Sequence, residues 1–153
     1  MARILLVGCG CRGRELARAL VDDGHAVRGT SRSPGRLAAI EAAGAEAALA
    51  DPDRLATLLP HLQGVSVVAW LMGGVGEPPL HGPRLQSLLE TLVDTPVRGL
   101  VYEAVGEADR ALLAGGAAIV RRAGATWRMP VEVVDGEPWK REMRAAVLRV
   151  LAA

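Results

Sequence analysis

The chain has 153 residues, half of them hydrophobic, and its 18 basic and 17 acidic residues give a formal net charge of +1 at pH 7. This length predicts a single domain, residues 1–153, with a sizeable core. The near-neutral charge gives no reason to expect nucleic acid or a membrane as a partner, and no apolar run is long enough to span a bilayer. With no recognisable signal peptide, and with Cys9 and Cys11 too close together for an unstrained disulfide, we expect a cytoplasmic protein.

Apolar runs alternate with amphipathic stretches along the first third of the chain. Residues 3–7 predict a strand, residues 12–22 an amphipathic helix that Gly24 ends, and residues 26–30 a second strand. Pro34 opens a helix that is expected to run to residue 43, and residues 46–49 predict a short third strand.

The middle of the chain continues this alternation. Asp51 and Pro52 are typical of a helix start and predict a helix over residues 53–62. A strongly apolar fourth strand is expected over residues 65–71, followed by a loop rich in Gly and Pro over residues 72–83. A helix over residues 84–93 and a fifth strand over residues 98–103 complete this part.

The last third is expected to begin with a helix over residues 107–123, in which Gly115 and Gly116 indicate a weak point or a break. A sixth strand is expected over residues 126–129, either extended or followed by another strand at residues 131–134, and Pro138 opens a final helix to residue 151. Short apolar strands linked by helices predict an α/β fold. We expect a doubly wound parallel sheet of about six strands in the order 3-2-1-4-5-6, with about six helices covering both faces.

The most specific motif joins the first strand to the first helix. Gly8-Cys9-Gly10-Cys11-Arg12-Gly13 is a G-x-G-x-x-G sequence placed directly between an apolar strand and a helix. In this context Gly8 lets the chain turn sharply, Gly10 lets a pyrophosphate approach the backbone, and Gly13 lets the helix pack close to the strand. The helix N-terminus adds free N–H groups and a partial positive charge. The motif therefore predicts a dinucleotide-binding Rossmann domain, with Cys11 and Arg12 beside the phosphates.

The end of the second strand indicates which dinucleotide is bound. Proteins that bind NAD place an Asp or Glu there, about twenty residues after the glycine loop. Here the segment ends in Thr30-Ser31-Arg32-Ser33 and contains no acid. Arg32 can hold a 2′-phosphate with both arms of its guanidinium, and the neighbouring hydroxyls can donate to it. We therefore expect NADP rather than NAD, the alternative being that Arg32 and Ser33 only precede and cap the next helix.

Two further positions near the expected cofactor have two interpretations each. Asp51 follows the third strand and either accepts a hydrogen bond from the adenine amino group or serves as a helix N-cap. Cys9 and Cys11 either fill the glycine loop as small residues or have a redox role, because a helix N-terminus can lower the pKa of a thiol.

Several segments together resemble NAD(P)-dependent epimerase/dehydratase-like proteins, which are extended or atypical members of the short-chain dehydrogenase/reductase superfamily. These segments are residues 8–13, 24–27, 30–33, 45–51, 97–106 and 126–130. Among them, Val101-Tyr102-Glu103 is similar to the start of the V-Y-x-S-S-x-G pattern of the family's fifth strand, and Arg128-Met129-Pro130 to an Arg-x-Pro at the end of the sixth. The resemblance implies a Rossmann fold, a nicotinamide cofactor and oxidoreductase or epimerase-like chemistry on a small molecule.

The catalytic residues that the resemblance implies are missing. The family uses a Tyr-x-x-x-Lys pair with a Ser or Thr, whereas this chain has one tyrosine, Tyr102, and one lysine, Lys140, far apart in sequence. The usual serine position after the tyrosine reads Glu103-Ala104. Two functions therefore stay open: a small NADP-dependent oxidoreductase or epimerase-like enzyme with an unidentified substrate, and a non-catalytic NADP(H) sensor or partner subunit.

Ligands of open α/β sheets lie beyond the carboxyl ends of the strands. We expect Leu71 there from the fourth strand, Tyr102 and Glu103 from the fifth, and residues 128–130 from the sixth. Glu103 is the best acid/base candidate, because a carboxylate in a cleft can have a raised pKa; the alternative is a solvated loop carboxylate. His81, in the loop over residues 72–83, is the one histidine expected near a substrate.

Two other expectations concern metals and partners. No spacing of His, Asp and Glu side chains predicts a metal site. The apolar face of the last helix either forms a homodimer interface or simply docks onto the sheet.

Overall fold

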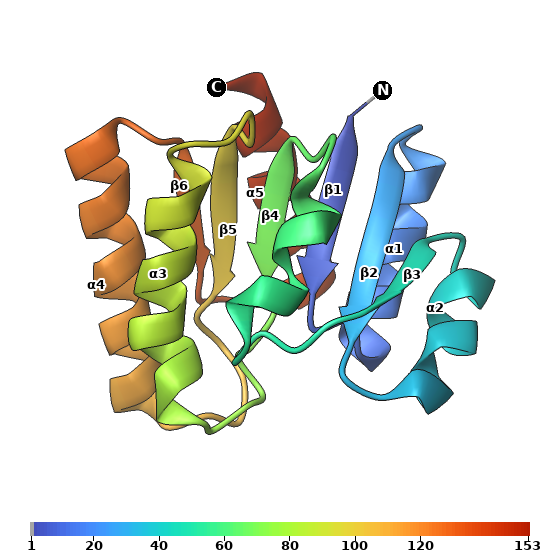
Figure 1. Cartoon of the computed structure of the whole chain (residues 1–153), viewed down its shortest axis with the longest axis horizontal. Coiled ribbons are helices and arrows are strands. Elements are labelled where there is room, and N and C mark those ends of the chain that lie inside the picture. The colour runs from blue at the N-terminus through green and yellow to red at the C-terminus, as the bar shows by residue number, and fades with distance from the viewer. Residues whose placement is uncertain (1) are drawn as a thin grey trace.

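The computed structural model describes residues 2–153, and its strands form one six-stranded parallel sheet in the order β3-β2-β1-β4-β5-β6. The strands are β1 (Arg3–Val7), β2 (Ala26–Ser31), β3 (Glu46–Leu49), β4 (Val67–Trp70), β5 (Gly99–Glu103) and β6 (Val131–Val134). Figure 1 shows their carboxyl ends along the lower edge of the sheet. The predicted fold class and strand order are therefore confirmed.

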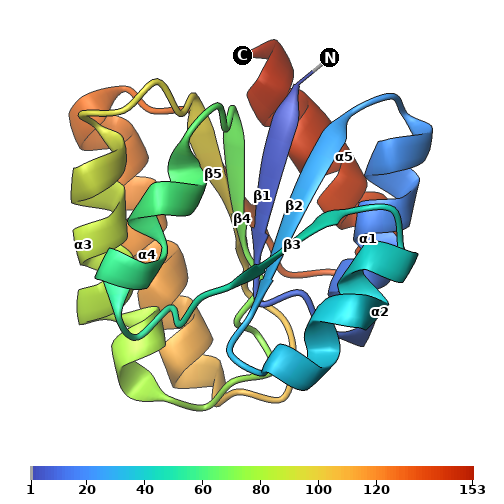
Figure 2. The ribbon, with the colours of Figure 1, turned by 45° about the vertical axis from the view of Figure 1, so that its right-hand side comes forward.

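Helices cover both faces of the sheet, as expected (Figures 1 and 2). They are α1 (Cys11–Asp22), α2 (Leu37–Ala42), α3 (Pro83–Leu92), α4 (Arg110–Trp127) and α5 (Trp139–Ala152). Alternate residues of β1 enter two separate cores: Ile4 and Leu6 pack with α1 and α5, whereas Leu5 and Val7 pack on the α3 side. Because a strand turns successive side chains to opposite faces, a strand covered on both faces is apolar throughout.

The last helix docks onto the sheet. Met143, Val147 and Val150 of α5 are buried in the same core as residues of β1, β4 and β5. This apolar face is therefore covered within the chain, which is the simpler of the two expected roles. None of the helices formed by residues 2–153 is both long enough and apolar enough to cross a membrane.

The segment after β3 does not form the expected helix over residues 53–62. It folds instead into two short 3₁₀ helices, Leu55–Thr57 and Leu59–Leu62. The hydroxyl of Thr57 bonds to the backbone carbonyls of Asp51 and Arg54, and hydroxyl-to-backbone bonds of this kind stabilise turns in competition with a helix. The described residues consequently form five α-helices rather than about six.

Residues 126–129 do not form the sixth strand either. Helix α4 continues to Trp127, Arg128 adopts the left-handed conformation (φ 52°) that ends it, and β6 begins at Val131. The buried residues of α4 keep a helical spacing along its whole length, and this packing extends the helix beyond the expected end. Residues 128–130 therefore precede β6 at the amino end of the sheet, and the expectation that they lie near the ligand was wrong.

The glycine pair Gly115-Gly116 does not break α4, which is continuous over 18 residues. Gly116 is buried against Tyr102 of β5, and a Cβ at this position would overlap the Tyr102 hydroxyl. The glycine is explained by the close approach of helix and strand rather than by a break.

Candidate functional site

The carboxyl edge of the sheet carries two adjoining pockets that share Gly8, Gly10, Leu71 and Gly74. The first, here called the β2 pocket, has a volume of about 430 Å³ and lies between the end of β2 and the loop after β4. The second, the β5 pocket, has a volume of about 470 Å³ and lies between α1, the end of β5 and α5. Because the glycine loop after β1 borders both pockets, they form one elongated cleft.

The three glycines of the motif have the geometry that their predicted roles require. Gly8 has φ +88°, a left-handed conformation that favours glycine, and a Cβ there would also overlap the side chain of Met72. A Cβ on Gly10 would meet no atom within 4 Å, so the backbone is open to the pockets at this point. A Cβ on Gly13 would lie 3.3 Å from Leu71 Cδ1, which shows how closely α1 packs on the loop after β4.

The N-terminus of α1 is open. Gly10 occupies the N-cap position without a side-chain cap, and the first turn holds no acidic residue. Among residues 2–153, the backbone N–H groups of Cys11, Arg12 and Gly13 have no hydrogen-bond partner. An uncapped helix end with free N–H groups beside a bare glycine suits the pyrophosphate of a dinucleotide. The glycine loop thus fits the group that the sequence predicts.

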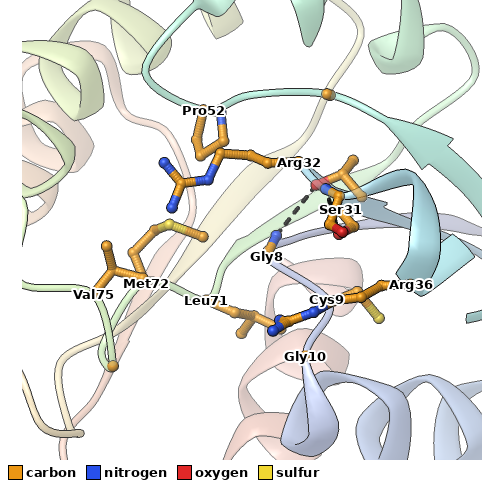
Figure 3. Close-up of a pocket in the computed structure, with 14 residues that line it drawn as sticks. Gly8, Cys9, Gly10, Ser31, Arg32, Arg36, Pro52, Leu71, Met72 and Val75 are labelled. Atoms are coloured by element: carbon orange, nitrogen blue, oxygen red, sulfur yellow. Dashed lines mark hydrogen bonds between the residues drawn. The ribbon is translucent and has the colours of Figure 1, made fainter. Parts of the chain in front are cut away.

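Thr30 ties the glycine loop to β2. Its hydroxyl accepts a hydrogen bond from the Gly8 N–H over 3.2 Å, and its carbonyl accepts one from the Cys9 N–H over 2.8 Å. Figure 3 shows a dashed hydrogen bond that leaves Gly8 beside Ser31 at the pocket wall. Thr30 lines the β2 pocket but is 1% exposed, so its main contribution is to hold the loop in shape.

Two arginines enter the β2 pocket, of which the sequence analysis identified one. Figure 3 shows Arg32 extending from the end of β2 and Arg36 from the 3₁₀ turn Pro34–Arg36. Arg32 Nη1 lies 3.3 Å from Glu77 Oε1, whereas Arg36 forms no ion pair with any described residue. The signal that could have found Arg36 is a second arginine on the short turn that Pro34 opens directly after Arg32 and Ser33.

Asp51 does not reach into the β2 pocket. Its neighbours Ala50 and Pro52 line the pocket, but Asp51 Oδ1 accepts a hydrogen bond from the Asp53 N–H over 3.0 Å. The side chain therefore stabilises the turn after β3, close to the capping role that was one of its two expected roles.

Glu103 is a buried carboxylate in the wall of the β5 pocket. It is 6% exposed, Oε1 accepts from the Gly73 N–H over 2.7 Å, and Oε2 accepts from Trp139 Nε1–H over 2.6 Å. Burial raises the pKa of Glu103 above its ordinary value, and the two hydrogen bonds oppose this rise. Glu103 is therefore not the solvated loop carboxylate of the alternative interpretation, and its acid/base role stays a prediction.

Arg12 and Trp139 also line the β5 pocket. The guanidinium carbon of Arg12 lies 4.5 Å from the centroid of the Trp139 ring, and Nη2 lies 3.5 Å from Glu137 Oε1. Cys11 lines the same pocket. The sequence analysis placed Trp139 only on the apolar face of the last helix, because its contact with Glu103 joins residues that are 36 positions apart.

Tyr102 and His81 lie outside the cleft. Tyr102 points to the face of the sheet opposite to that of Glu103, is fully buried there, and bonds His81 Nδ1 over 2.7 Å through its hydroxyl. The Val75 carbonyl can only accept, so Nε2 of His81 donates a hydrogen bond to it over 2.7 Å. His81 is therefore an anchor of the loop after β4, and its expected position near a substrate was wrong.

The two cysteines are free thiols with different surroundings. Cys9 is buried, and a Cβ on Gly29 would lie only 2.8 Å from its sulfur. Burial raises the pKa of the Cys9 thiol to about 11, so this residue is a packing group of the loop. Cys11 is exposed. Residues 2–153 contain no cluster of three or more His, Cys, Asp or Glu side chains that could hold a metal ion.

No protein family model and no curated protein sequence matches the chain. Many solved structures match its fold. They include triphenylmethane reductase from Citrobacter sp. complexed with NADP(H), at 18% identity and a TM-score of 0.66, covering 88% of this chain and 49% of that one. A short-chain dehydrogenase/reductase superfamily protein from Agrobacterium tumefaciens with bound NAD matches at 18% identity and a TM-score of 0.67. The match covers 87% of this chain and 48% of that one. UDP-glucose 4-epimerase from Thermotoga maritima with UDP-glucose matches at 11% identity and a TM-score of 0.69. The match covers 87% of this chain and 54% of that one.

These matches confirm the resemblance that the motifs indicated, at the level of the fold. The chain has the doubly wound Rossmann fold found in NAD(P)-dependent epimerase/dehydratase and short-chain dehydrogenase/reductase structures. It spans about half the length of the solved structures that it matches.

Proposed function

We propose that this chain binds NADP(H) along the cleft and acts as a small oxidoreductase or epimerase-like protein. The observation that carries the proposal is the open N-terminus of α1 behind Gly10, placed between two pockets of a size suited to the two halves of a dinucleotide. The solved structures with bound NADP(H) and NAD support a nicotinamide cofactor. When bound, such a cofactor supplies hydride transfer.

Each pocket supplies a different kind of group to this proposal. The N–H groups of Cys11, Arg12 and Gly13 hold the pyrophosphate, and the Leu71 side chain provides an apolar wall between the pockets. In the β2 pocket, Ser31, Arg32 and Arg36 bind the adenosine 2′-phosphate. No carboxylate stands at the end of β2 itself, and this favours NADP over NAD.

The β5 pocket is where a small substrate would meet the nicotinamide ring. Glu103 is the buried carboxylate in its wall and can hold a proton there. Tyr102 is not available for this role, because its hydroxyl is buried on His81.

One observation favours a second candidate, a non-catalytic NADP(H) sensor or partner subunit. Both oxygens of Glu103 already accept hydrogen bonds from Gly73 and Trp139, so the carboxylate holds β5, the loop after β4 and α5 together. A carboxylate with this structural task is less free to exchange a proton with a substrate. Both candidates share the cofactor site.

Calorimetric titration of the protein with NADP, NADPH, NAD and NADH tests the shared site. We expect binding in the micromolar range, about −8 kcal/mol, with the phosphorylated forms bound more tightly. Absence of binding by all four would overturn the proposal. If the cofactor binds, a screen for oxidation of NADPH by small carbonyl compounds separates the enzyme from the sensor.

A further inference from the structure

An acidic side chain does reach the Arg32 side chain, although none is present at the end of β2. Glu77 lies in the loop between β4 and α3, 45 residues further along the chain, and its Oε1 is 3.3 Å from Arg32 Nη1. The side chains of Arg32 and Glu77 are 48% and 46% exposed, so water and ligands have access to the pair.

The backbone around Glu77 is folded. Its carbonyl accepts a hydrogen bond from the Leu80 N–H over 3.1 Å, which starts the 3₁₀ turn Pro78–His81. Two residues before it, the Val75 carbonyl is bound by the buried His81 ring. Met72, Gly74 and Val75 of the same loop line the β2 pocket. The carboxylate is thus presented at the rim of the pocket by an anchored loop.

We infer that Glu77 is a specificity-determining residue of the cofactor site, which lowers the preference for a 2′-phosphate and favours a free ribose hydroxyl. This inference rests on the proposed function. A 2′-phosphate carries a charge of about −2 and has to compete with Glu77 for the Arg32 guanidinium. The Glu77 carboxylate also repels the phosphate, because both groups are negatively charged. A 2′-hydroxyl instead donates to the carboxylate, as it does to the acid at the end of the second strand in NAD-binding domains.

Because of Arg36, Glu77 reduces the preference for a 2′-phosphate without reversing it. It lines the same pocket and has no carboxylate partner among the described residues, so a 2′-phosphate retains one unopposed arginine. The site therefore takes both cofactors, with Arg36 favouring NADP(H) and the Arg32–Glu77 pair reducing its advantage over NAD(H).

The test compares Glu77→Gln with the unchanged protein by calorimetric titration with NADPH and NADH at low salt. We expect the variant to bind NADPH about fivefold tighter, because the repulsion is lost, and NADH about threefold more weakly. The matched control is Glu132→Gln on β6, which also removes one negative charge and one arginine partner, Arg149, but does not line the cleft. It should leave both affinities unchanged.

The outcomes separate the two proposals. If the unchanged protein binds both cofactors and Glu77→Gln leaves the ratio of their affinities unchanged, the role of Glu77 is refuted while the cofactor site stands. If Glu132→Gln changes the ratio of the two affinities by the same factor, the role of Glu77 is also refuted, because the change in net charge alone would explain the effect. If neither cofactor binds the unchanged protein or the variant, the proposed function itself fails.

Discussion

Arg32 and Arg36 enter the same pocket, but they face different electrostatic surroundings. Arg32 forms an ion pair with Glu77, and an exposed pair of this kind contributes only about 0–1 kcal/mol to stability. Arg36 has no such partner among the described residues. A bound phosphate therefore gains more from Arg36 than from Arg32, since it need not displace a carboxylate first.

Replacing each arginine in turn tests this difference. We expect Arg36→Ala to weaken NADPH binding by about 2–3 kcal/mol and Arg32→Ala by about 1 kcal/mol, both with little effect on NADH. Arg18→Ala, an exposed arginine of α1 that lines neither pocket, serves as the control in the same titrations. An equal loss for NADPH and NADH would show that the arginine does not bind the 2′-phosphate.

The buried carboxylate of Glu103 makes stability depend on pH in a defined direction. Its pKa is raised in the folded protein by burial, above the ordinary value of 4.5. The unfolded chain therefore releases this proton first as the pH rises. The stability that Glu103 contributes is fully present below about pH 4.5 and is lost as the pH rises through the folded pKa.

Glu103→Gln removes this titration. The amide also keeps only one acceptor oxygen for the two donors of Gly73 and Trp139, so we expect a loss of about 1–3 kcal/mol in the free energy of unfolding at low pH. The difference in the free energy of unfolding between the variant and the unchanged protein should become smaller as the pH rises. Urea unfolding at a series of pH values measures this difference. Glu107→Gln, an exposed carboxylate of the same pocket, should show no such trend. A gap that widens with pH would contradict the direction given for the Glu103 pKa.

At the scale of the elements, α4 shows how packing overrides a local signal. Two adjacent glycines in a helix suggest an interruption, yet the helix runs on, because its small residues let it approach β5 closely. Of the pair, only Gly116 faces Tyr102, whereas a Cβ on Gly115 would meet no atom within 4 Å.

The glycine pair makes a matched test within one helix. We expect Gly115→Ala to stabilise the protein by about 1 kcal/mol, because alanine has the higher helix propensity and the position is open. Gly116→Ala should destabilise it by about 1–3 kcal/mol, because the methyl group would displace the Tyr102 ring from its contact with His81. Thermal and urea unfolding report both changes, and similar effects of the two substitutions would contradict the packing explanation.

The elements that the sequence analysis misplaced share one cause. The segment over residues 53–62 has a good helix start in Asp51-Pro52, but the hydroxyl of Thr57 and Pro60 favour turns over a continuous helix. Residues 126–129 look like a strand in isolation and are the end of a helix in the fold. In both segments the local preferences were weak, so side-chain bonds and packing decided the outcome.

At the scale of the whole molecule, the position of the cleft follows from the order of the strands. The chain leaves β1 towards β2 on one side and returns to β4 on the other, so the connections after β1 and β4 diverge at the carboxyl edge (Figure 2). Ligands of open α/β sheets bind at such a switch point. Both pockets border this point, since each is lined by Gly8 and Leu71.

The sequence by itself determined the fold class, the strand order and the glycine loop, because these depend on signals within a few residues: apolar runs, their spacing, and glycines at fixed positions between a strand and a helix. Only the tertiary structure decided the partners of the charged and polar side chains. It pairs Arg32 with Glu77 across 45 positions, Glu103 with Trp139 across 36, and His81 with Tyr102 across 21. Such contacts arise where separate crossovers return to the same edge of the sheet, and no spacing along the chain encodes which side chains then meet.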